Sequence, residues 1–341
     1  MKRLVTIAIP VYKRLQYLPG ALRSAAEQDY ANIELIVSDN GDNGSTIRKI
    51  VDANYPHPYR FRQNPQTVPL TTHFNQLLAE ASGEYFVMLA DDDELSPRYV
   101  SELAGLLDRN PRASFGVGSQ EILDEGGQVI RRTKVSLPQT LSGPEFFRAA
   151  FHTYEYGFEC FMTYLVRTAE FRRFGGYPDT PMGNAADDAV LLKLCLDRDV
   201  VLSDRCAFRY RVYHSSYGLS VPIEDLAEAI RRAIDMLDSD PDYRSFAQSN
   251  PAEWAELKRY LTENKLGTYY FRWRDVYRGR LTRRQWVRAA FAFPYSRYYY
   301  SRVCSTLLNT VAYSVTDRLA AMSAFGRRLS RRLISAGSRE D

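Results

Sequence analysis

Short apolar segments alternate with amphipathic segments along the first part of this chain of 341 residues. The apolar segments predict strands, and the segments between them, with apolar residues at helical spacing, predict helices. The predicted strands lie at residues 4–10, 33–37, 60–62 and 85–90, and the predicted helices at residues 18–26, 46–51 and 71–81. This alternation predicts an α/β fold with a mostly parallel, Rossmann-like sheet flanked by helices.

Polar side chains follow three of these predicted strands. They lie in the segments 10–12, 38–40 and 90–93. In open α/β sheets, ligands bind outside the carboxyl ends of the strands. We therefore expect these three segments to line one crevice.

Three consecutive aspartates, at positions 91–93, follow the apolar segment 85–90. Like charges held together destabilise a fold unless a cation offsets them. Carboxylate oxygens select Mg²⁺ or Mn²⁺, which proteins usually share with substrate phosphates. The alternative is a solvated acidic turn that caps the next helix through its dipole, and the residues alone leave both interpretations open. The segment 94–97 predicts a turn and a helix start, with Pro97 at the first helical position.

Further elements are predicted in the middle of the chain. Helices are expected at residues 99–107 and 189–196, strands at 114–119 and 158–166, and a hairpin at 120–129. A loop with two glycines and a proline lies at residues 174–178. Asp187 and Asp188 open the helix at 189–196, where acidic residues also occur for ordinary capping and dipole reasons.

From residue 220 onward the pattern predicts helices only. They are expected at residues 223–237, 254–271, 283–293 and 303–325. We place a domain boundary near Gly218, which gives an α/β domain at 1–218 and an all-helical region at 219–341.

The helical region is basic, although the net charge of the whole chain is only +4. From Lys258 to the end there are 18 Lys and Arg against 5 Asp and Glu, a balance of +13. A basic tail of this kind typically binds phosphates, either on nucleic acid or on an anionic membrane surface. The segment 291–300 combines aromatic residues with arginines, and it predicts either a membrane-interface element or packing onto the α/β body.

Several classes of protein are disfavoured by the remaining features. The four cysteines are scattered without a C-x-x-C pair, so we expect neither a zinc site nor a disulfide framework, and we infer reduced thiols in a cytosolic protein. The apolar run after Met1 is short and contains Pro10, so we predict a first strand and not a signal peptide. No stretch approaches 18 uninterrupted apolar residues, so no span of a bilayer is expected.

Several of these segments, in this order and spacing, resemble the landmarks of the family 2 inverting glycosyltransferases with a GT-A fold. They are Ile9-Pro10-Val11-Tyr12-Lys13-Arg14, Val37-Ser38-Asp39-Asn40, Ala81-Ser82-Gly83-Glu84-Tyr85-Phe86, Leu89 to Glu94, Gly175-Gly176-Tyr177 and Asp187-Asp188. The resemblance covers roughly the first 215 residues and does not extend to the helical tail.

The resemblance implies a nucleotide-sugar donor site at the end of the first strand. Pro10, Tyr12 and Arg14 would contact the nucleotide, with Tyr12 stacked on the base. Asp39 would accept the imino N–H of the base, which suits uracil, and the alternative is that Asp39 caps the helix near Thr46. Asp91 is expected to contact the donor as well.

The resemblance also implies an Mn²⁺ or Mg²⁺ ion on the donor diphosphate, held by a D-x-D motif. The family usually has an aspartate where Ala90 stands, which aligns Asp92 with the metal-binding position. The literal D-x-D uses Asp91 and Asp93, so the register stays open. His214 falls where similar enzymes often carry a histidine that reaches the metal or diphosphate, and a structural histidine is the alternative.

For catalysis the resemblance implies a carboxylate base opposite the donor. Asp188 is expected to take the proton from the acceptor hydroxyl, and Asp187 is a neighbour that raises the pKa of Asp188. Gly175-Gly176 would let the acceptor loop approach the donor closely. Arg209 and Arg211 are expected to contact the diphosphate or the acceptor.

These inferences predict a metal-dependent inverting glycosyltransferase that uses a UDP-sugar donor in bacterial-type surface polysaccharide synthesis. Its acceptor would be a hydroxyl of a glycan or lipid-linked glycan. The tail would place this cytoplasmic enzyme on the inner face of the cell membrane, or would form a homo-oligomer. One alternative is a non-catalytic sugar-nucleotide binder. Another is a nucleic-acid-binding protein, which gives no reason for carboxylates at three strand ends, so no nucleic-acid partner is expected.

Overall fold

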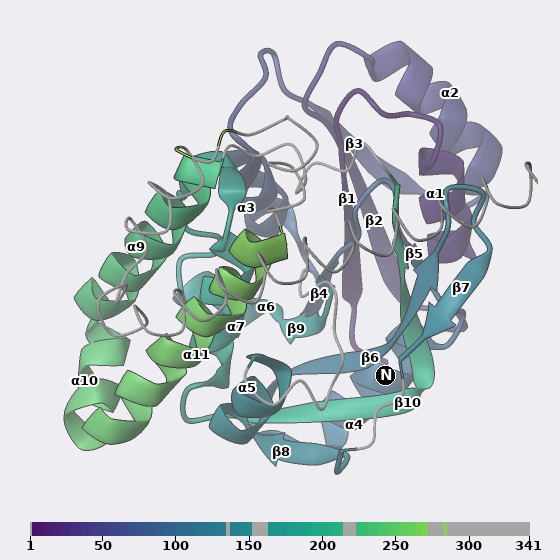
Figure 1. The fold of residues 1–341 in the computed structure, drawn as a ribbon. Helices are drawn as coiled ribbons and strands as arrows, with labels where there is room; N and C mark the ends of the chain where they lie inside the picture. Colours follow the sequence, from purple (N-terminus) through teal and green to yellow (C-terminus); the bar gives the residue numbers. More distant parts are fainter. Residues whose placement is uncertain are drawn as a thin grey trace, which may run out of the picture.

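A single mixed sheet of ten strands runs through the computed structural model (Figure 1). The structure describes residues 2–133, 137–151, 163–213 and 223–271, together with Thr282 and Arg284. The strand order is β3-β2-β1-β4-β9-β6-β10-β5, with β7 paired to β6 and β8 paired to β10. Helices cover both faces of the sheet, so the predicted α/β class is confirmed.

The first four strands form the parallel part of the sheet, as the sequence predicts. They are β1 (Val5–Val11), β2 (Ile33–Asp39), β3 (Tyr59–Gln63) and β4 (Tyr85–Met88). The helices between them are α1 (Leu18–Ala26), α2 (Gly44–Asn54) and α3 (Leu70–Glu80). All residues of β1 are buried because helices cover it on both faces, which explains its nearly continuous apolar sequence.

The second half of the sheet is mixed. Its strands are β5 (Glu94–Leu95), β6 (Ala113–Leu123), β7 (Val129–Arg132), β8 (Thr140–Ser142), β9 (Leu165–Arg167) and β10 (Asp199–Arg211). Short β9 lies antiparallel between β4 and β6, and only the pair of β6 and β10 is parallel here. The helices are α4 (Tyr99–Arg109), α5 (Gly143–Phe151), α6 (Thr168–Arg173) and α7 (Ala186–Cys195), with a 3₁₀ turn η1 (Pro181–Gly183).

The turn and helix start predicted at residues 94–97 are only partly right. Glu94 and Leu95 form β5, which pairs antiparallel with β10. The turn lies at Pro97 and Arg98, and the helix begins at Tyr99, where the helix 99–107 was predicted to start. Pro97 therefore precedes the helix and is not its first residue, and its carbonyl accepts a hydrogen bond from the backbone N–H of Asp29. The sequence analysis did not predict β10, so the pairing partner of these residues was missing from the prediction.

Two hydrophobic clusters lie on the two faces of the sheet. One cluster includes apolar residues of α1, α2 and α4. The other includes residues of α3, α5, α6 and α7, and also of three C-terminal helices, α9 (Ile223–Ser239), α10 (Pro241–Ser249) and α11 (Pro251–Phe271). The green helices α9, α10 and α11 pack on one another in Figure 1, and α9 contacts α7 while α11 contacts α5. The described C-terminal helices therefore share a core with the sheet.

The predicted apolar face of α9 is confirmed where side chains are described, because Ile230, Ile234 and Leu237 are buried. The boundary near Gly218 lies outside the described residues, and the division into two domains stays a prediction. The aromatic segment 291–300 and the predicted helix 303–325 also lie outside them. Within the described ranges, none of the helices combines the length and the apolar composition that crossing a membrane requires.

Candidate functional site

A cavity of about 460 Å³ opens at the carboxyl ends of β1, β2 and β4. Its lining brings together residues that the sequence analysis selected, namely Pro10, Tyr12, Arg14, Asp91 and Asp92. The other lining residues are Val11, Asn40, Ala90 and Met182, together with residues of the segment 67–74. The crevice expected at the strand ends is therefore present.

Asp91 and Asp92 lie in the wall of this cavity, in the turn between β4 and β5. Oδ2 of Asp91 accepts a hydrogen bond from the backbone N–H of Tyr12 at 3.3 Å. Burial, and secondarily the charge of Asp92, raise the pKa of Asp91 to about 8. Because this turn leads into a strand, it does not cap a following helix.

Asp93 turns away from the cavity. Its side chain is only 2% exposed, and its Oδ1 accepts a hydrogen bond of 2.9 Å from the backbone N–H of Arg211. Burial, then the charge of Asp92, raise the pKa of Asp93 well above its usual range. This carboxyl group ties the acidic turn to the end of β10.

Arg211 supports the same turn from inside the protein. Its guanidinium donates to the backbone oxygen of Asp92 at 2.9 Å and pairs with Glu94 at 2.7 Å. It also donates to the carbonyls of Asp124 and Glu125, in the β6–β7 turn. Arg211 is 5% exposed, and its guanidinium contacts other parts of the protein. This arrangement differs from the predicted contact with a diphosphate or acceptor.

Arg209, the other arginine expected to contact a substrate, pairs with Glu121 at 2.9 Å. A second carboxylate, that of Glu94, lies 4.0 Å from its guanidinium. Arg209 therefore joins β10 to the neighbouring strands β5 and β6, because Glu94 lies on β5 and Glu121 on β6.

Tyr213 bridges the two sides of the cavity mouth, and the sequence analysis gave it no role. Its hydroxyl donates a hydrogen bond of 2.5 Å to Oδ2 of Asp92 and accepts one from Arg14. Its ring packs against Tyr17 with a centroid separation of 5.2 Å. The next residue, His214, lies outside the described residues, so its predicted role stays a prediction.

Asp39 is completely buried beneath the cavity wall. Its two carboxylate oxygens accept hydrogen bonds from the backbone N–H groups of Gly41 at 2.8 Å and Asn43 at 2.9 Å. These bonds hold the turn that leads into α2, and neither goes to an N–H group of the helix itself, which begins at Gly44. Whether Asp39 also contacts a base stays a prediction.

Asn40 fixes the opposite wall of the cavity. Its carboxamide donates to the carbonyl of Val68 at 2.9 Å and accepts from the N–H of Val68 at 3.0 Å. The same amide oxygen accepts a hydrogen bond of 2.9 Å from Asn64. Asn40 and Asn64 are both at least 95% buried, so the segment that includes Val68 is held at a defined position.

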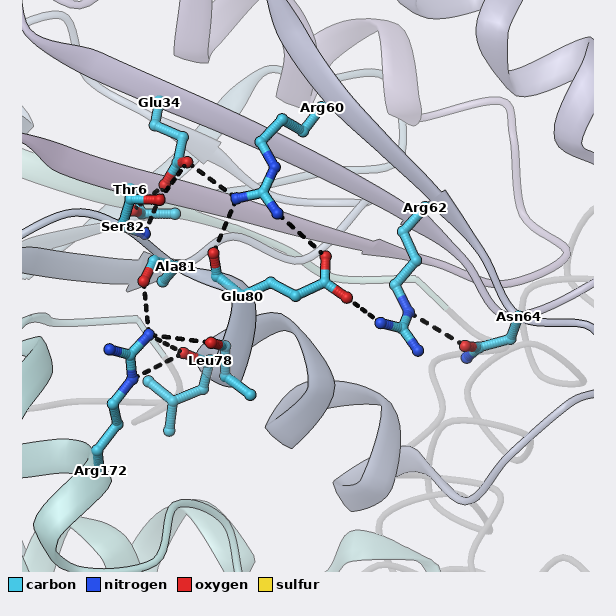
Figure 2. Close-up of polar contacts among 11 residues, drawn as sticks. Thr6, Glu34, Arg60, Arg62, Asn64, Leu78, Glu80, Ala81, Ser82 and Arg172 are labelled. Atoms are coloured by element: carbon cyan, nitrogen blue, oxygen red, sulfur yellow. Dashed lines mark hydrogen bonds and ion pairs between the residues drawn. The ribbon is translucent and has the colours of Figure 1, made fainter.

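A chain of ion pairs supports Asn64 from the edge of the sheet (Figure 2). Arg62 donates to Oδ1 of Asn64 at 3.2 Å and pairs with Glu80 at the end of α3. Arg60 joins Glu80 to Glu34 on β2. The same end of α3 is capped by Arg172, whose guanidinium donates to the carbonyls of residues 78, 79 and 81. Charged side chains outside the cavity thus position its wall.

His73 lies in the lining of the cavity and is neutral. Its Nε2 lies 2.8 Å from the hydroxyl of Ser38. Burial, then the positive charge of Arg62, lower the pKa of His73 to about 4. The sequence analysis did not single out this histidine, because nothing in a helical segment marks one side chain as facing a cavity.

Asp187 and Asp188 occupy the first turn of α7, as predicted. Asp188 is fully buried, and neither carboxylate is in the lining of the cavity of about 460 Å³. Burial raises the pKa of Tyr164, and the charges of Tyr177 and Asp187 add to the increase. The turn η1, which precedes α7, reaches the cavity through Met182.

Gly175 and Gly176 have φ values of 78° and 71°, a region that residues with a Cβ rarely adopt. The backbone of this loop therefore requires glycine at both positions. Their expected role, a close approach of the acceptor loop to the donor, stays a prediction.

A divalent cation fits the residues of the acidic turn. Among the residues that the structure describes, no three His, Cys, Asp or Glu side chains converge as a complete protein site would require. Two carboxylates, Asp91 and Asp92, do line one cavity, and burial together with their repulsion disfavours charge on Asp91. Mg²⁺ is commonly held by one or two carboxylates together with substrate phosphates and water. The donor set therefore fits an ion shared with a diphosphate.

A model of glycosyl transferase family 2 matches residues 6–172. Through these residues the chain belongs to glycosyl transferase family 2. The match includes the acidic turn and ends within α6, so α7, β10 and the C-terminal helices of this family 2 protein lie beyond it.

Relatives of this family 2 protein share part of its length. An uncharacterized glycosyltransferase of Rickettsia conorii is 32% identical over 134 residues, which are 38% of this chain and 22% of that protein. The GalNAc(5)-diNAcBac-PP-undecaprenol beta-1,3-glucosyltransferase of Campylobacter jejuni is 31% identical over 102 residues, which are 29% of this chain and 33% of the enzyme. The chain thus spans a third or less of the length of either relative.

The structure also resembles that of residues 1–349 of TarS from S. aureus. The TM-score is 0.63 at 16% identity, and the alignment covers 86% of this chain and 80% of that one. A complex of the same protein with UDP-GlcNAc gives a TM-score of 0.61 at 18% identity, over 85% of this chain and 82% of that one. The likeness confirms the fold predicted for this family 2 protein.

Proposed function

We propose that this protein is a metal-dependent inverting glycosyltransferase that transfers a sugar from a nucleotide-diphosphate donor to a hydroxyl of a glycan. The observation that carries the proposal is the cavity at the strand ends, in which Asp91 and Asp92 face the segment with Pro10, Tyr12 and Arg14. This places two carboxylates and a cation around one space large enough for a ligand.

The donor is proposed to be a UDP-sugar. Tyr12 is 42% exposed at the cavity, so its ring is accessible to stack on a base. Arg14 supplies positive charge for a phosphate. The buried pair Asn40 and Asn64 holds the wall near Val68 in a fixed position against which a base can pack. TarS, which shares this fold, has been solved with UDP-GlcNAc.

Asp92 is our proposed ligand of Mn²⁺ or Mg²⁺, and Asp91 contacts the donor beside it. A bound ion would stabilise the negative charge that accumulates on the departing nucleoside diphosphate. The position of Asp92 in the cavity lining supports its assignment as the metal ligand. Asp93, whose Oδ1 accepts a bond from the Arg211 N–H, is proposed to position the turn.

Asp188 is proposed to act as the general base. Its carboxylate would take the proton from the acceptor hydroxyl while the hydroxyl oxygen forms a bond to the anomeric carbon from the far side. The bond from that carbon to the diphosphate oxygen breaks, and its electron pair leaves with the diphosphate. Asp187, in the same helical turn, is proposed to assist Asp188 through its charge.

The acceptor is proposed to be a glycan or a lipid-linked glycan, in the synthesis of a bacterial-type surface polysaccharide. The printed name of the Campylobacter jejuni relative specifies an undecaprenol-linked acceptor, which supports this class. The basic tail after Lys258 would bring the protein to an anionic membrane surface on the cytoplasmic side, or would form a homo-oligomer.

A thermal-shift titration with UDP and Mn²⁺ tests the donor site. A ligand at 100 times its dissociation constant stabilises a protein by about 2.7 kcal/mol, so binding raises the midpoint. Asp92→Asn should abolish the Mn²⁺-dependent part of the shift. Asp93→Asn is the matched control, because its amide oxygen can still accept the bond from Arg211. No shift with UDP in the wild type would reject the donor assignment.

A non-catalytic sugar-nucleotide binder remains the second candidate, because Asp188 is fully buried and a general base must reach its proton. Hydrolysis of UDP-sugars in the presence of Mn²⁺ separates the two candidates. A working enzyme hydrolyses one donor slowly and loses this activity in Asp188→Asn, with UDP binding unchanged. Binding of UDP without hydrolysis or transfer of any sugar would favour the binder.

A further inference from the structure

A second, smaller cavity of about 230 Å³ lies next to the proposed donor site. The two cavities share Pro69, Leu70 and Met182 in their linings, so they lie on either side of the same residues. The second cavity lies where the start of α3 meets η1, and α9 contributes Arg232 to its lining.

Two charged side chains line this second cavity. Arg232 donates from Nε to Glu228 at 2.9 Å, and its other guanidinium donors make no hydrogen bond within the part of the chain that the structure describes. Asp179 is exposed and supplies a carboxylate. Thr180 lines the cavity as well, but its hydroxyl is buried. The cavity therefore offers a donor fork and an acceptor.

The loop between the cavities has a strained backbone. Met182 and Ala185 have φ values of 56° and 57°, in the left-handed region that residues with a Cβ rarely adopt. Gly183, with a φ of 72°, lies so close to Leu70 that an added Cβ would approach its Cδ2 to 2.8 Å. Strain of this kind persists where the surrounding structure enforces it, and it is concentrated at binding sites.

We propose that the second cavity binds one neutral sugar ring of the acceptor, an inference that rests on the proposed transferase function. A sugar hydroxyl both donates and accepts hydrogen bonds, so a carboxylate and a guanidinium together match the hydroxyls of a sugar ring. The apolar side chains of Leu70 and Met182 provide surface for the C–H faces of such a ring. Asp179 and Arg232 carry opposite charges, so together they favour a neutral ligand over an ion of either sign.

The position of the cavity along the chain agrees with this assignment. The segment from Asp179 to Gly183 leads directly into α7, whose first turn carries Asp187 and the proposed base Asp188. Arg232 lies beyond residues 6–172, the part that matches the family model. The C-terminal helices would thus select the acceptor, while the family domain binds the donor.

Saturation-transfer NMR on the full chain with UDP and Mn²⁺ tests the proposal. The probes are the methyl glycosides of glucose, galactose, mannose, N-acetylglucosamine and N-acetylgalactosamine. At least one should bind, and Arg232→Ala or Asp179→Asn should weaken that binding by about tenfold, as expected for loss of a hydrogen bond to a charged group. The matched control is Arg231→Ala, because Arg231 also pairs with Glu228 but does not line the cavity.

Three outcomes would overturn the proposal. They are the absence of binding by every glycoside, equal binding by Arg232→Ala and wild type, and equal weakening in Arg231→Ala. A parallel UDP titration distinguishes failure of the proposed acceptor cavity from failure of the proposed transferase function. If UDP binds and no glycoside does, only the acceptor cavity is rejected. If a glycoside binds through Arg232 and UDP does not, the cavity still binds sugar but its assignment to an acceptor fails.

Discussion

The hydroxyl of Tyr213 donates a hydrogen bond of 2.5 Å to Oδ2 of Asp92, although 121 residues separate them in the chain. The same hydroxyl accepts a bond from Arg14, which follows β1. Burial and the bond to Asp92 raise the pKa of Tyr213, so the phenol keeps its proton and can donate it. The end of β10 thus orients the proposed metal ligand and a proposed phosphate contact together.

We expect Tyr213→Phe to weaken Mn²⁺ binding about fivefold in the presence of UDP, because a hydrogen bond of this kind contributes about 1 kcal/mol. Calorimetric titration of Mn²⁺ measures the effect. Tyr59→Phe is the matched control, since it removes a 2.7 Å bond from a phenol to Asp52 on an exposed surface. Equal Mn²⁺ affinities for Tyr213→Phe and the control would show that the bridge does not position Asp92.

Asn40→Ala should weaken UDP binding about tenfold without removing a proposed ligand contact. The substitution deletes both bonds to the Val68 backbone and leaves Asn64 without its acceptor, so the cavity wall loses its fixed position. Calorimetric titration of UDP measures this loss. The comparison variant is Asn54→Ala, which deletes bonds to Ile50 and Arg23 away from the cavity. Unchanged UDP affinity in Asn40→Ala would contradict the role of the wall.

His73 should make the protein sensitive to mild acid. Its pKa is about 4 in the folded protein against 6.5 in the unfolded chain, so between these values only the unfolded state takes up the proton. The contribution of neutral His73 to the unfolding free energy is complete above about pH 6.5, and it is lost as the pH falls from there to about 4. A shift of this size corresponds to about 3 kcal/mol.

Urea unfolding at pH 7.5 and pH 4.5 measures this loss. His73→Gln should reduce the difference in unfolding free energy between the two pH values by about 2 kcal/mol, because glutamine does not titrate. His57→Gln replaces an exposed histidine and serves as the control. A pH difference that is the same in His73→Gln and the wild type would reject the assignment to His73.

The sequence predicted the elements that depend on local pattern. The boundaries of α1 at Leu18–Ala26 agree with the structure, because apolar spacing and the first-turn proline are local features. β5 was missed, since its two residues are a strand only through pairing with β10. Likewise, three adjacent aspartates look equivalent in the sequence. The backbone N–H of Arg211, 118 residues away, binds the buried Asp93, whereas Asp91 and Asp92 line the cavity.

The cavity wall is a second feature that the sequence alone does not predict. Asn40 follows a strand whose end was correctly expected to face the crevice, yet two of its side-chain bonds are with Val68, in a loop with no recognisable pattern. Sequence periodicity reports which face of an element is buried, and it carries no information about a partner in another loop.

The C-terminal helices should unfold together with the sheet, because α9, α10 and α11 share its hydrophobic cluster. Lys193 on α7 tests this coupling. Its side chain is 4% exposed, and its ammonium pairs at 2.9 Å with Asp240, which lies between α9 and α10. Asp240→Ala leaves a buried cation without this carboxylate and should lower the unfolding free energy by about 3 kcal/mol.

Removing the unpaired charge as well should recover much of the lost unfolding free energy. The double variant Lys193→Met with Asp240→Ala is therefore expected to be more stable than Asp240→Ala alone. Asp235→Ala is the control, because Asp235 pairs with Arg231 on an exposed helix face. This substitution should change the unfolding free energy by less than about 0.5 kcal/mol. Urea unfolding followed by both circular dichroism and tryptophan fluorescence should give one coincident transition. The contrary outcome is two separated transitions, with Asp240→Ala affecting only one of them. The helices would then fold independently of the sheet, and the residues of the proposed acceptor cavity, which include Arg232, would belong to two cooperative units.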